Sequence, residues 1–361
     1  MIFLSIVIPA YNCQNTIIPL LSSIAVSKRV NFREIEVIVV DDGSKDETVA
    51  IISSIASRNG GFSEAHFGSL HASHPLFQLK IISLKKNQGP AHARNVGAKY
   101  AKGEVLIFFD SDVVVYKNTL FEVVRSFKSD PDLFALTGVW DKVQKSRDFF
   151  PKFKALRDWS YWINERDPRN YYYLFSTRVA AIRRGLFYRL GGFDDTYKAA
   201  LVEDIELTYR IAKRHAVVFD PKVIVSHEFE DFATVAKKYF WRSYYWSKIY
   251  RERKRFDPVA TTGKEALTTI SAALLVMMGI FYLLVFIMNY KLIIMGKISF
   301  DSLILASLFF ILLVHLWGVR KFLLFAAKEE GVVFAVKSFF TGIALYLMIL
   351  SGAAASFLSN R

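Results

Sequence analysis

The chain has 361 residues, of which 53% are hydrophobic, and a formal net charge of +14 from 47 basic and 33 acidic residues. Soluble domains are rarely so apolar and nucleic-acid-binding proteins are rarely so hydrophobic, so this composition indicates an apolar region joined to a charged one. The 32 Phe and 17 Tyr exclude a disordered chain, and the single cysteine, Cys13, excludes a disulfide-stapled scaffold.

The N-terminal part of the chain alternates strand and helix patterns. Short β-branched runs predict strands at 4–8, 36–40, 80–84 and 105–109, and helical spacing predicts helices at 16–27, 47–57, 90–101 and 205–213. Such alternation is typical of an α/β sheet with helices on both faces, in which ligands bind beyond the carboxyl ends of the strands. The sequence has no Gly-rich dinucleotide motif and no P-loop motif, so it does not support those two nucleotide-binding folds.

Polar residues follow the predicted strands. The runs end in Pro9-Ala10-Tyr11-Asn12, Asp41-Asp42-Gly43-Ser44, Lys85-Lys86-Asn87 and Asp110-Ser111-Asp112. Neighbouring carboxylates repel unless a cation or hydrogen-bond donors neutralise them, and oxygen ligands suit Mg²⁺ or Mn²⁺ bridging to substrate phosphates. Asp110 and Asp112 are therefore a candidate metal site, with solvated acids at a strand–loop junction as the alternative.

Two helix starts add candidate groups. Arg94 follows the predicted helix start at Pro90, where free N–H groups suit a phosphate that the guanidinium could also reach. Glu203 and Asp204 open a later helix, whose field keeps a first-turn carboxylate ionised and able to act as a general base toward an acceptor hydroxyl. A surface arginine and helix-capping acids are the simpler interpretations.

Three long apolar runs lie in the C-terminal part. Residues 267–288, 302–319 and 338–358 contain no Lys, Arg, Asp or Glu. Each is long enough, or nearly so, to cross a hydrocarbon core of about 30 Å as a helix. They predict a membrane domain over 265–361, in which the short run 302–319 could instead be tilted, re-entrant or interfacial. Three runs within about 95 residues disfavour the alternative of buried helices in a large soluble domain.

A basic, aromatic segment precedes the first run. Residues 237–264 hold nine basic and two acidic residues, interleaved with Tyr, Phe and Trp. Such a helix suits the surface of an anionic leaflet, and its place beside a span favours this over a nucleic-acid surface, so 231–264 is a predicted interfacial segment.

The distribution of basic residues predicts the orientation. Of the Lys and Arg residues that flank the predicted spans, thirteen fall on the side of this segment and three on the opposite side. Residues 1–10 do not resemble a signal peptide. We therefore expect a multi-pass protein of the cell membrane, with residues 1–230 in the cytoplasm and no nucleic-acid partner.

Taken together, the motifs resemble those of the family 2 glycosyltransferases. They are Ser5 to Asn12, Asp41 to Ser44, Asn87 to Gly97, Asp110-Ser111-Asp112, Gly191-Gly192-Phe193-Asp194 and Glu203-Asp204, in this order within about residues 3–230. The resemblance implies an α/β GT-A fold, the Rossmann-like mixed sheet of nucleotide-diphospho-sugar transferases, over residues 1–230. It also implies inverting transfer of a sugar from a nucleotide-diphosphate sugar.

The resemblance further implies roles for single positions. Pro9, Ala10, Tyr11 and Asn12 would line the nucleotide pocket, Asp41 and Asp42 would contact the base or ribose, and Asn87, Arg94 and Ser111 would lie near the donor or its phosphates. Asp110 would hold ribose or metal-bound water, Asp112 would bind the metal, Mg²⁺ or Mn²⁺, and His227 would be a further ligand or a histidine at a strand end. Asp204 would be the catalytic base, with Glu203 shaping the pocket.

Two departures from related patterns bear on the acceptor. Processive synthases carry Gln-x-x-Arg-Trp after the acidic pair, whereas this chain reads Lys238-Tyr239-Phe240-Trp241-Arg242, and three spans are few for a polymer channel. Val114 stands where polyprenol-phosphate transferases often have a polar residue. We expect transfer of a single sugar to a lipid-linked or membrane-proximal glycan acceptor. A processive polysaccharide synthase and an inactive membrane scaffold of the same fold are the alternatives.

Overall fold

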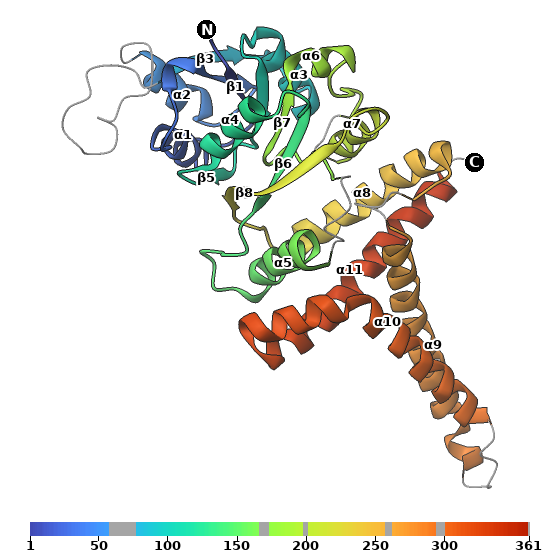
Figure 1. Cartoon of the computed structure of the whole chain (residues 1–361). Coiled ribbons are helices and arrows are strands. Elements are labelled where there is room, and N and C mark those ends of the chain that lie inside the picture. Colours follow the sequence, from blue (N-terminus) through green and yellow to red (C-terminus); the bar gives the residue numbers. More distant parts are fainter. Residues whose placement is uncertain (58–76, 166–172, 198–200, 257–261, 294–299, 360–361) are drawn as a thin grey trace. The chain divides into compact units, whose positions relative to one another are not determined.

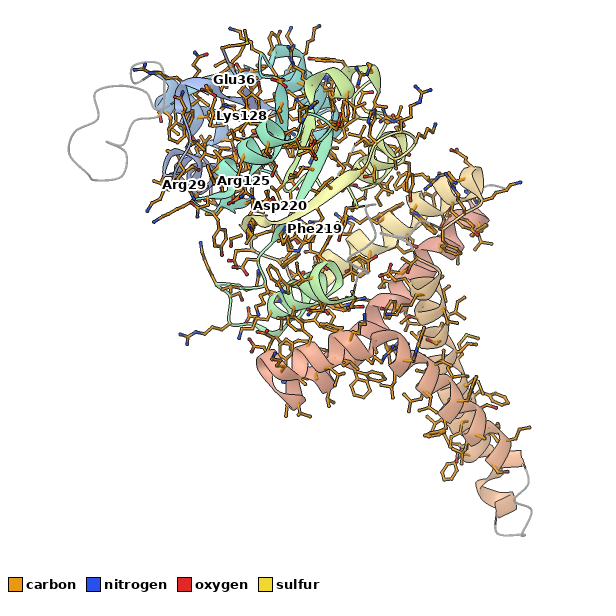
Figure 2. The ribbon with its side chains drawn as sticks, in the orientation of Figure 1. Arg29, Glu36, Arg125, Lys128, Phe219 and Asp220 are labelled. Atoms are coloured by element: carbon orange, nitrogen blue, oxygen red, sulfur yellow. The ribbon has the colours of Figure 1, made fainter. Side chains whose placement is uncertain are left out.

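The computed structural model describes residues 1–57, 77–165, 173–197, 201–256, 262–293 and 300–359. They form two compact units, Met1–Phe229 and Glu230–Arg361 (Figure 1). Figure 2 adds the described side chains of both units. Part of the predicted interfacial segment, residues 257–261, lies outside the described residues.

The first unit is built on an eight-stranded mixed sheet. Its strands are β1 (Leu4–Ala10), β2 (Ile35–Asp41), β3 (Gln78–Ser83), β4 (Val105–Phe108), β5 (Val113–Val115), β6 (Ala135–Trp140), β7 (Ala180–Arg183) and β8 (Val217–His227), in the spatial order β3-β2-β1-β4-β7-β6-β8-β5. The four strands predicted from sequence form the parallel half, β3-β2-β1-β4. β7 is antiparallel to both its neighbours, β6 and β8 are parallel to each other, and β5 is antiparallel to β8.

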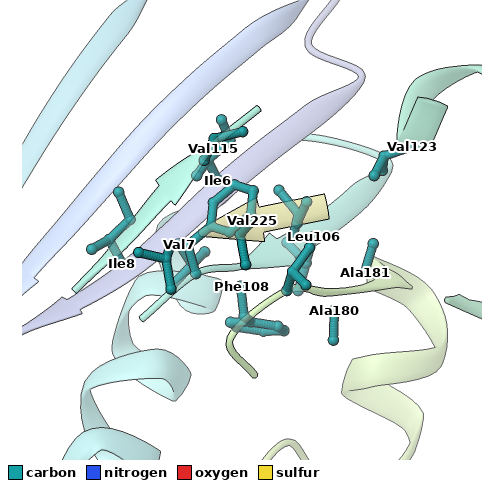
Figure 3. Close-up of a cluster of buried hydrophobic side chains, with 14 of the residues drawn as sticks. Ile6, Val7, Ile8, Leu106, Phe108, Val115, Val123, Ala180, Ala181 and Val225 are labelled. Atoms are coloured by element: carbon teal, nitrogen blue, oxygen red, sulfur yellow. The ribbon is translucent and has the colours of Figure 1, made fainter. Parts of the chain in front are cut away.

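The core of this unit lies around the central strands. Every residue of β1, β2 and β4 is buried, as expected for apolar strands covered on both faces. Figure 3 shows Ile6, Val7 and Ile8 of β1 grouped with Leu106 and Phe108 of β4. Continuous apolar runs therefore predicted these strands correctly.

The helices of the unit connect and cover these strands. They are α1 (Ile17–Ala25), α2 (Thr48–Ser57), α3 (Pro90–Tyr100), α4 (Thr119–Ser129), α5 (Phe149–Trp159), α6 (Arg184–Arg189) and α7 (Glu203–Ile211), with short turns η1 (Phe32–Glu34) and η3 (Ser160–Glu165). α3 packs closely on β1, because a Cβ at Gly97 would lie only 2.5 Å from Cγ1 of Val7. α7 starts two residues earlier than the spacing predicted, so both acids of the Glu203-Asp204 pair lie inside the helix.

The second unit consists of long helices. They are α8 (Phe232–Arg253), α9 (Gly263–Ile293), α10 (Phe300–Glu330) and α11 (Val332–Leu358). Three segments, Gly263–Ile287, Ser302–Glu330 and Val332–Leu358, are long and apolar enough to cross a membrane. Large apolar side chains such as Phe309 and Leu324 are 62% and 71% exposed, which suits hydrocarbon better than water.

Helix α8 packs along the last of these helices. A Cβ at Gly352 of α11 would clash with the carbonyl oxygen of Phe240, so the two backbones approach closely there. Arg251 Nη1 donates to the carbonyl oxygen of Ser356 at 2.9 Å. The hydroxyl of Ser243 donates to the carbonyl oxygen of Ile349 at 2.7 Å. Residues 237–253 of the basic, aromatic segment thus belong to a helix that packs on α11.

Candidate active site

The loops after β1 and β2 are locked together at the carboxyl edge of the sheet. The backbone N–H of Asn12 donates to Ser44 Oγ at 3.0 Å, and the N–H of Lys45 donates to Asn12 Oδ1 at 2.9 Å. Asn12 has φ +48°, a left-handed conformation that asparagine tolerates better than most residues. Gly43 has φ +74°, and a Cβ there would lie 2.9 Å from the backbone of Lys86. Two of the predicted donor-binding loops are therefore adjacent.

Asp41 and Asp42 are both buried and support these loops. Asp41 Oδ1 accepts the N–H of Ser44 at 3.2 Å. The two oxygens of Asp42 accept the N–H groups of Gln88 at 2.9 Å and Gly89 at 2.8 Å. Burial raises the pKa of Asp42 against the opposing effect of these two N–H groups. Asp42 therefore binds the two N–H groups, of Gln88 and Gly89, that come just before the helix start at Pro90.

The other residues predicted to bind the donor differ in their exposure and contacts. Tyr11 is 42% exposed beyond the end of β1, whereas Pro9 and Ala10 are buried within the strand. Asn87 is exposed, and its Oδ1 accepts the N–H of Gly89 at 3.1 Å. Ser111 lies beside the thiol of Cys13.

Arg94 lies buried between two carboxylates. Its Nη2 is 2.6 Å from Asp110 Oδ1 and its Nη1 is 2.9 Å from Glu203 Oε1. The side chain is 2% exposed, so the surface-arginine interpretation is wrong. Burial alone would lower the pKa of Arg94, but the two carboxylates outweigh it and raise this pKa. Arg94 therefore joins the end of β4 to the start of α7, and both of its terminal nitrogens are engaged within the protein.

Asp112 and His227 meet although 114 residues separate them along the chain. β5 pairs with β8 so that Val113 lies opposite His227, and Asp112 Oδ2 is 3.3 Å from His227 Nε2. The imidazole is 4% exposed, while the side chain of Asp112 is 47% exposed. A carboxylate oxygen suits Mg²⁺ or Mn²⁺, and an imidazole nitrogen suits transition metals, so this pair fits Mn²⁺ better than Mg²⁺.

The predicted third metal ligand, Asp110, is held elsewhere. Its Oδ1 is bound by Arg94. Within the described parts of the chain, no three or more His, Cys, Asp or Glu residues form a metal-binding group. The structure therefore brings Asp112 and His227 together and ties Asp110 to the guanidinium.

Gln144 fixes the end of β8 that carries His227. Its Nε2 donates to the carbonyl oxygen of His227 at 2.8 Å, and its Oε1 accepts the N–H of Phe229 at 2.9 Å. The sequence did not single out this residue, because a lone glutamine after a strand carries no local signal of such a contact.

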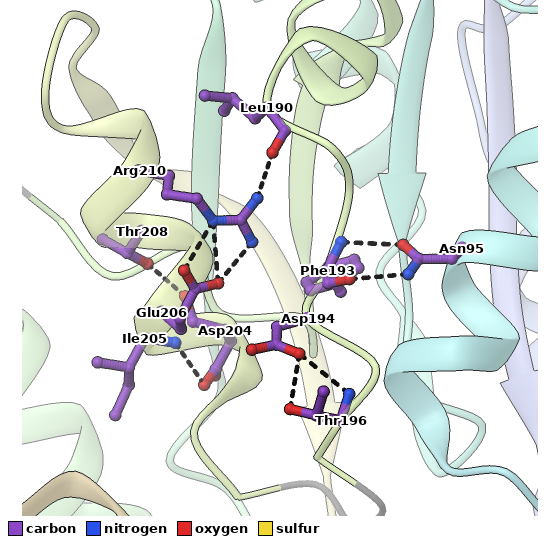
Figure 4. Close-up of polar contacts among 10 residues, drawn as sticks. All are labelled: Asn95, Leu190, Phe193, Asp194, Thr196, Asp204, Ile205, Glu206, Thr208 and Arg210. Atoms are coloured by element: carbon purple, nitrogen blue, oxygen red, sulfur yellow. Dashed lines mark hydrogen bonds and ion pairs between the residues drawn. The ribbon is translucent and has the colours of Figure 1, made fainter. Parts of the chain in front are cut away.

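The loop that precedes α7 is held by α3. Asn95 binds both backbone groups of Phe193, accepting its N–H at 2.9 Å and donating to its carbonyl oxygen at 2.8 Å (Figure 4). Gly192, with φ +73°, leaves room for this contact, since a Cβ there would lie 2.6 Å from Asn95 Oδ1. The Gly-Gly-Phe-Asp motif therefore positions the chain for the start of α7.

Glu203 and Asp204 have different surroundings in the first turn of α7. Glu203 is 2% exposed, and besides Arg94 it accepts the N–H of Leu201 at 2.9 Å through Oε2. Asp204 is partly exposed, and its Oδ1 accepts the N–H of Ile205 at 2.8 Å (Figure 4). The helix N-terminus favours the ionised form of a first-turn carboxylate. Asp204 is therefore the carboxylate of this pair with access to solvent.

The sequence of the first unit matches a known protein family. A sequence model of the family described as "Glycosyl transferase family 2" matches residues 5–191, just over half of the chain. The chain belongs to glycosyl transferase family 2. The match includes the loops after β1, β2 and β4 and all of α3, whereas Glu203, Asp204 and His227 follow it.

Two relatives with curated names match part of this chain. The poly(ribitol-phosphate) β-N-acetylglucosaminyltransferase TarS of Staphylococcus aureus (strain Mu50 / ATCC 700699) is 32% identical over 139 residues, which cover 37% of this chain and 21% of the relative. The uncharacterized glycosyltransferase YfnE of Bacillus subtilis (strain 168) is 29% identical over 139 residues, 38% of this chain and 30% of the relative. The chain thus spans less than a third of the length of these relatives.

One solved structure is similar to this chain in fold. The mannosyltransferase PcManGT from Pyrobaculum calidifontis, in complex with GDP-Man and Mn²⁺, matches with a TM-score of 0.56 at 18% identity, covering 99% of this chain and 88% of that chain. The expected family and the GT-A fold are therefore confirmed.

Proposed function

We propose that this protein is an inverting glycosyltransferase. It transfers a single sugar from a nucleoside-diphosphate sugar to a lipid-linked or membrane-proximal acceptor at the cytoplasmic face of the cell membrane. The observation that carries this proposal is that Arg94 binds both Asp110 and Glu203, which joins the donor-side strand end to the helix that carries Asp204. The named activity of TarS and the ligands of PcManGT support a nucleotide-sugar donor.

The donor binds at the carboxyl edge of the parallel strands. Its nucleoside lies over residues 9–12 and 41–44, whose loops are locked by Asn12 and Ser44. Asp112 and His227 would hold a divalent cation, Mn²⁺ or Mg²⁺. Such a cation would neutralise charge on the diphosphate leaving group. The Mn²⁺ in the PcManGT complex supports this assignment.

Asp204 is the general base. It takes the proton of the acceptor hydroxyl, whose oxygen attacks the anomeric carbon opposite the bond to the diphosphate, so that the configuration inverts. Glu203 is unsuited to this role, since one of its oxygens is bound by Arg94 and the other by the N–H of Leu201. Glu203 instead fixes the position of the helix start.

Replacing the base tests the proposal directly. We expect Asp204→Asn to lower sugar transfer by about 10²-fold or more while donor binding stays unchanged. Glu206→Gln is the matched control on the same helix, because Glu206 pairs with Arg210 four residues on. Normal turnover by Asp204→Asn in the full-length protein would show that another group is the base.

The donor and the reaction type need separate measurements. UDP-, GDP- and dTDP-sugars are screened for thermal stabilisation of the full chain, with Mn²⁺, Mg²⁺ or a chelator, because a ligand that binds the native state raises its stability. The length of the product made with the selected donor distinguishes one transferred sugar from a polymer. Absence of any stabilisation or transfer would favour an inactive scaffold.

A further inference from the structure

Arg178 is a half-buried arginine that lies against two aromatic rings. It immediately precedes Val179 and β7, and its guanidinium carbon lies 4.6 Å from the ring centre of Trp140 and 5.5 Å from that of Phe229. No salt bridge joins it to a carboxylate within the ranges that the structure describes. Three other half-buried arginines of the unit, Arg157, Arg183 and Arg210, each have a carboxylate partner, whereas Arg184, like Arg178, has none among the described residues.

The sheet topology brings Arg178 to the edge that carries the candidate site. β7 runs antiparallel to β4, with Ala180 opposite Phe108, so the residues before Ala180 lie beyond the end of β4 that leads to Asp110. The ring of Phe229 also contacts His227 in a T-shaped arrangement, with ring centres 4.7 Å apart. A single aromatic ring therefore contacts both the guanidinium and the proposed metal ligand.

The N–H groups of Arg178 have no hydrogen-bond partner among the described residues, besides the two ring contacts. Aromatic faces hold a guanidinium through its plane, while its N–H groups point outward along the edges, in the fork that matches phosphate oxygens. Two neighbouring buried atoms, Trp140 Nε1 and His227 Nδ1, also have no hydrogen-bond partner in the described part of the unit. Unpaired donors beside a site for diphosphate chemistry fit an anionic ligand.

We propose that Arg178, held on Trp140 and Phe229, binds a phosphate group of a substrate. This rests on the proposed function, since it assigns a further binding residue to the same site. The phosphate belongs either to the diphosphate of the donor or to a phosphorylated lipid acceptor, and the same guanidinium chemistry serves both.

The test compares Arg178→Gln with a matched control in the full chain in detergent. Arg29→Gln removes a guanidinium that also lies over a ring, 4.1 Å from the centre of Phe121, beside Leu4 and Ile35 at the opposite, amino-terminal edge of the sheet. UDP and GDP with Mn²⁺ are the donor probes, and UMP and GMP lack the second phosphate. Geranylgeranyl phosphate is the acceptor probe, and geranylgeraniol is its phosphate-free counterpart.

Each outcome decides the inference. Loss of a charge-assisted phosphate contact is expected to weaken binding about tenfold or more. A donor role weakens UDP or GDP and spares UMP or GMP, whereas an acceptor role weakens geranylgeranyl phosphate alone. Equal binding of every phosphate probe by Arg178→Gln and Arg29→Gln would overturn the inference. If the unmodified protein binds none of these probes, the proposed function itself fails.

A folding defect is separated by a second variant. Arg178→Lys keeps the charge and loses the fork, so intermediate binding at an unchanged melting temperature supports phosphate recognition. If both variants melt lower than Arg29→Gln and yet bind the probes normally, Arg178 has a structural role only.

Discussion

Arg94 carries its charge inside the protein, with Asp110 and Glu203 as its partners. Removing one member of a buried ionic group leaves the others uncompensated, which typically costs about 3–5 kcal/mol. We therefore expect Arg94→Met to lower the thermal stability of the first unit, measured by tryptophan fluorescence of the full chain, far more than Arg189→Met at an exposed position. Adding Asp110→Asn and Glu203→Gln should recover part of the loss. Equal melting of the two single variants would contradict this role of Arg94.

Cys13 gives a second prediction at the scale of one residue. Its thiol is 7% exposed, and burial raises its pKa above the ordinary value of 9.0. A raised pKa leaves less thiolate at any given pH, so alkylation by iodoacetamide should be slow at neutral pH and should keep rising with pH beyond the ordinary thiol pKa, where an exposed thiol levels off. Mass spectrometry of this single cysteine between about pH 7 and pH 10 measures the rate. Rapid labelling of the folded chain at neutral pH would exclude the buried, protonated thiol.

Single residues also mark the limit of prediction from sequence. The motifs indicated the loops that carry the site, because each follows a strongly apolar strand. The partners of Arg94 were not predicted, because Glu203 lies far from it along the chain and is brought next to it only by the fold. For the same reason the sequence did not predict that the two oxygens of Asp42 accept the N–H groups of Gln88 and Gly89.

At the scale of elements, the close contact between α8 and α11 depends on a glycine. A Cβ at Gly352 would clash with the backbone of Phe240, whereas a Cβ at Gly342 of the same helix meets no atom within 4 Å. Gly352→Ala should therefore lower the melting temperature of the full chain in detergent. Gly342→Ala should leave it unchanged or raise it, because alanine favours a helix by up to about 1 kcal/mol over glycine. Similar effects of both substitutions would argue against tight packing at Gly352.

The strands also differ in how strongly their own sequence predicts them. Strands β1 to β4 are apolar and β-branched, so their own residues identify them. β5 has three residues, and β7, Ala180–Arg183, begins with two alanines of weak strand propensity. Both are strands because their neighbours in the sheet supply hydrogen bonds, and one sequence read locally does not contain that information.

For the whole molecule, the distribution of basic residues predicts the orientation in the membrane. In a Cys13→Ser background, a cysteine replacing exposed Lys145 or Lys328 should react with a membrane-impermeant maleimide only after the cells are permeabilised. A cysteine replacing Lys297, which lies outside the described residues, should react in intact cells. Labelling of Lys145→Cys in intact cells would place the first unit on the opposite side.

The order of the strands in the sheet also has a consequence for synthesis on the ribosome. β8 is the last strand along the chain, yet it lies between β6 and β5, and β5 pairs with no other strand of the described sheet. In a nascent chain that ends before β8, β5 lacks its partner and Asp112 lacks His227. Since domains fold as units during translation, the proposed metal pair forms only as the ribosome reaches the region before the first candidate span, Gly263–Ile287. Completion of the proposed site and synthesis of the first candidate span therefore follow each other closely in time.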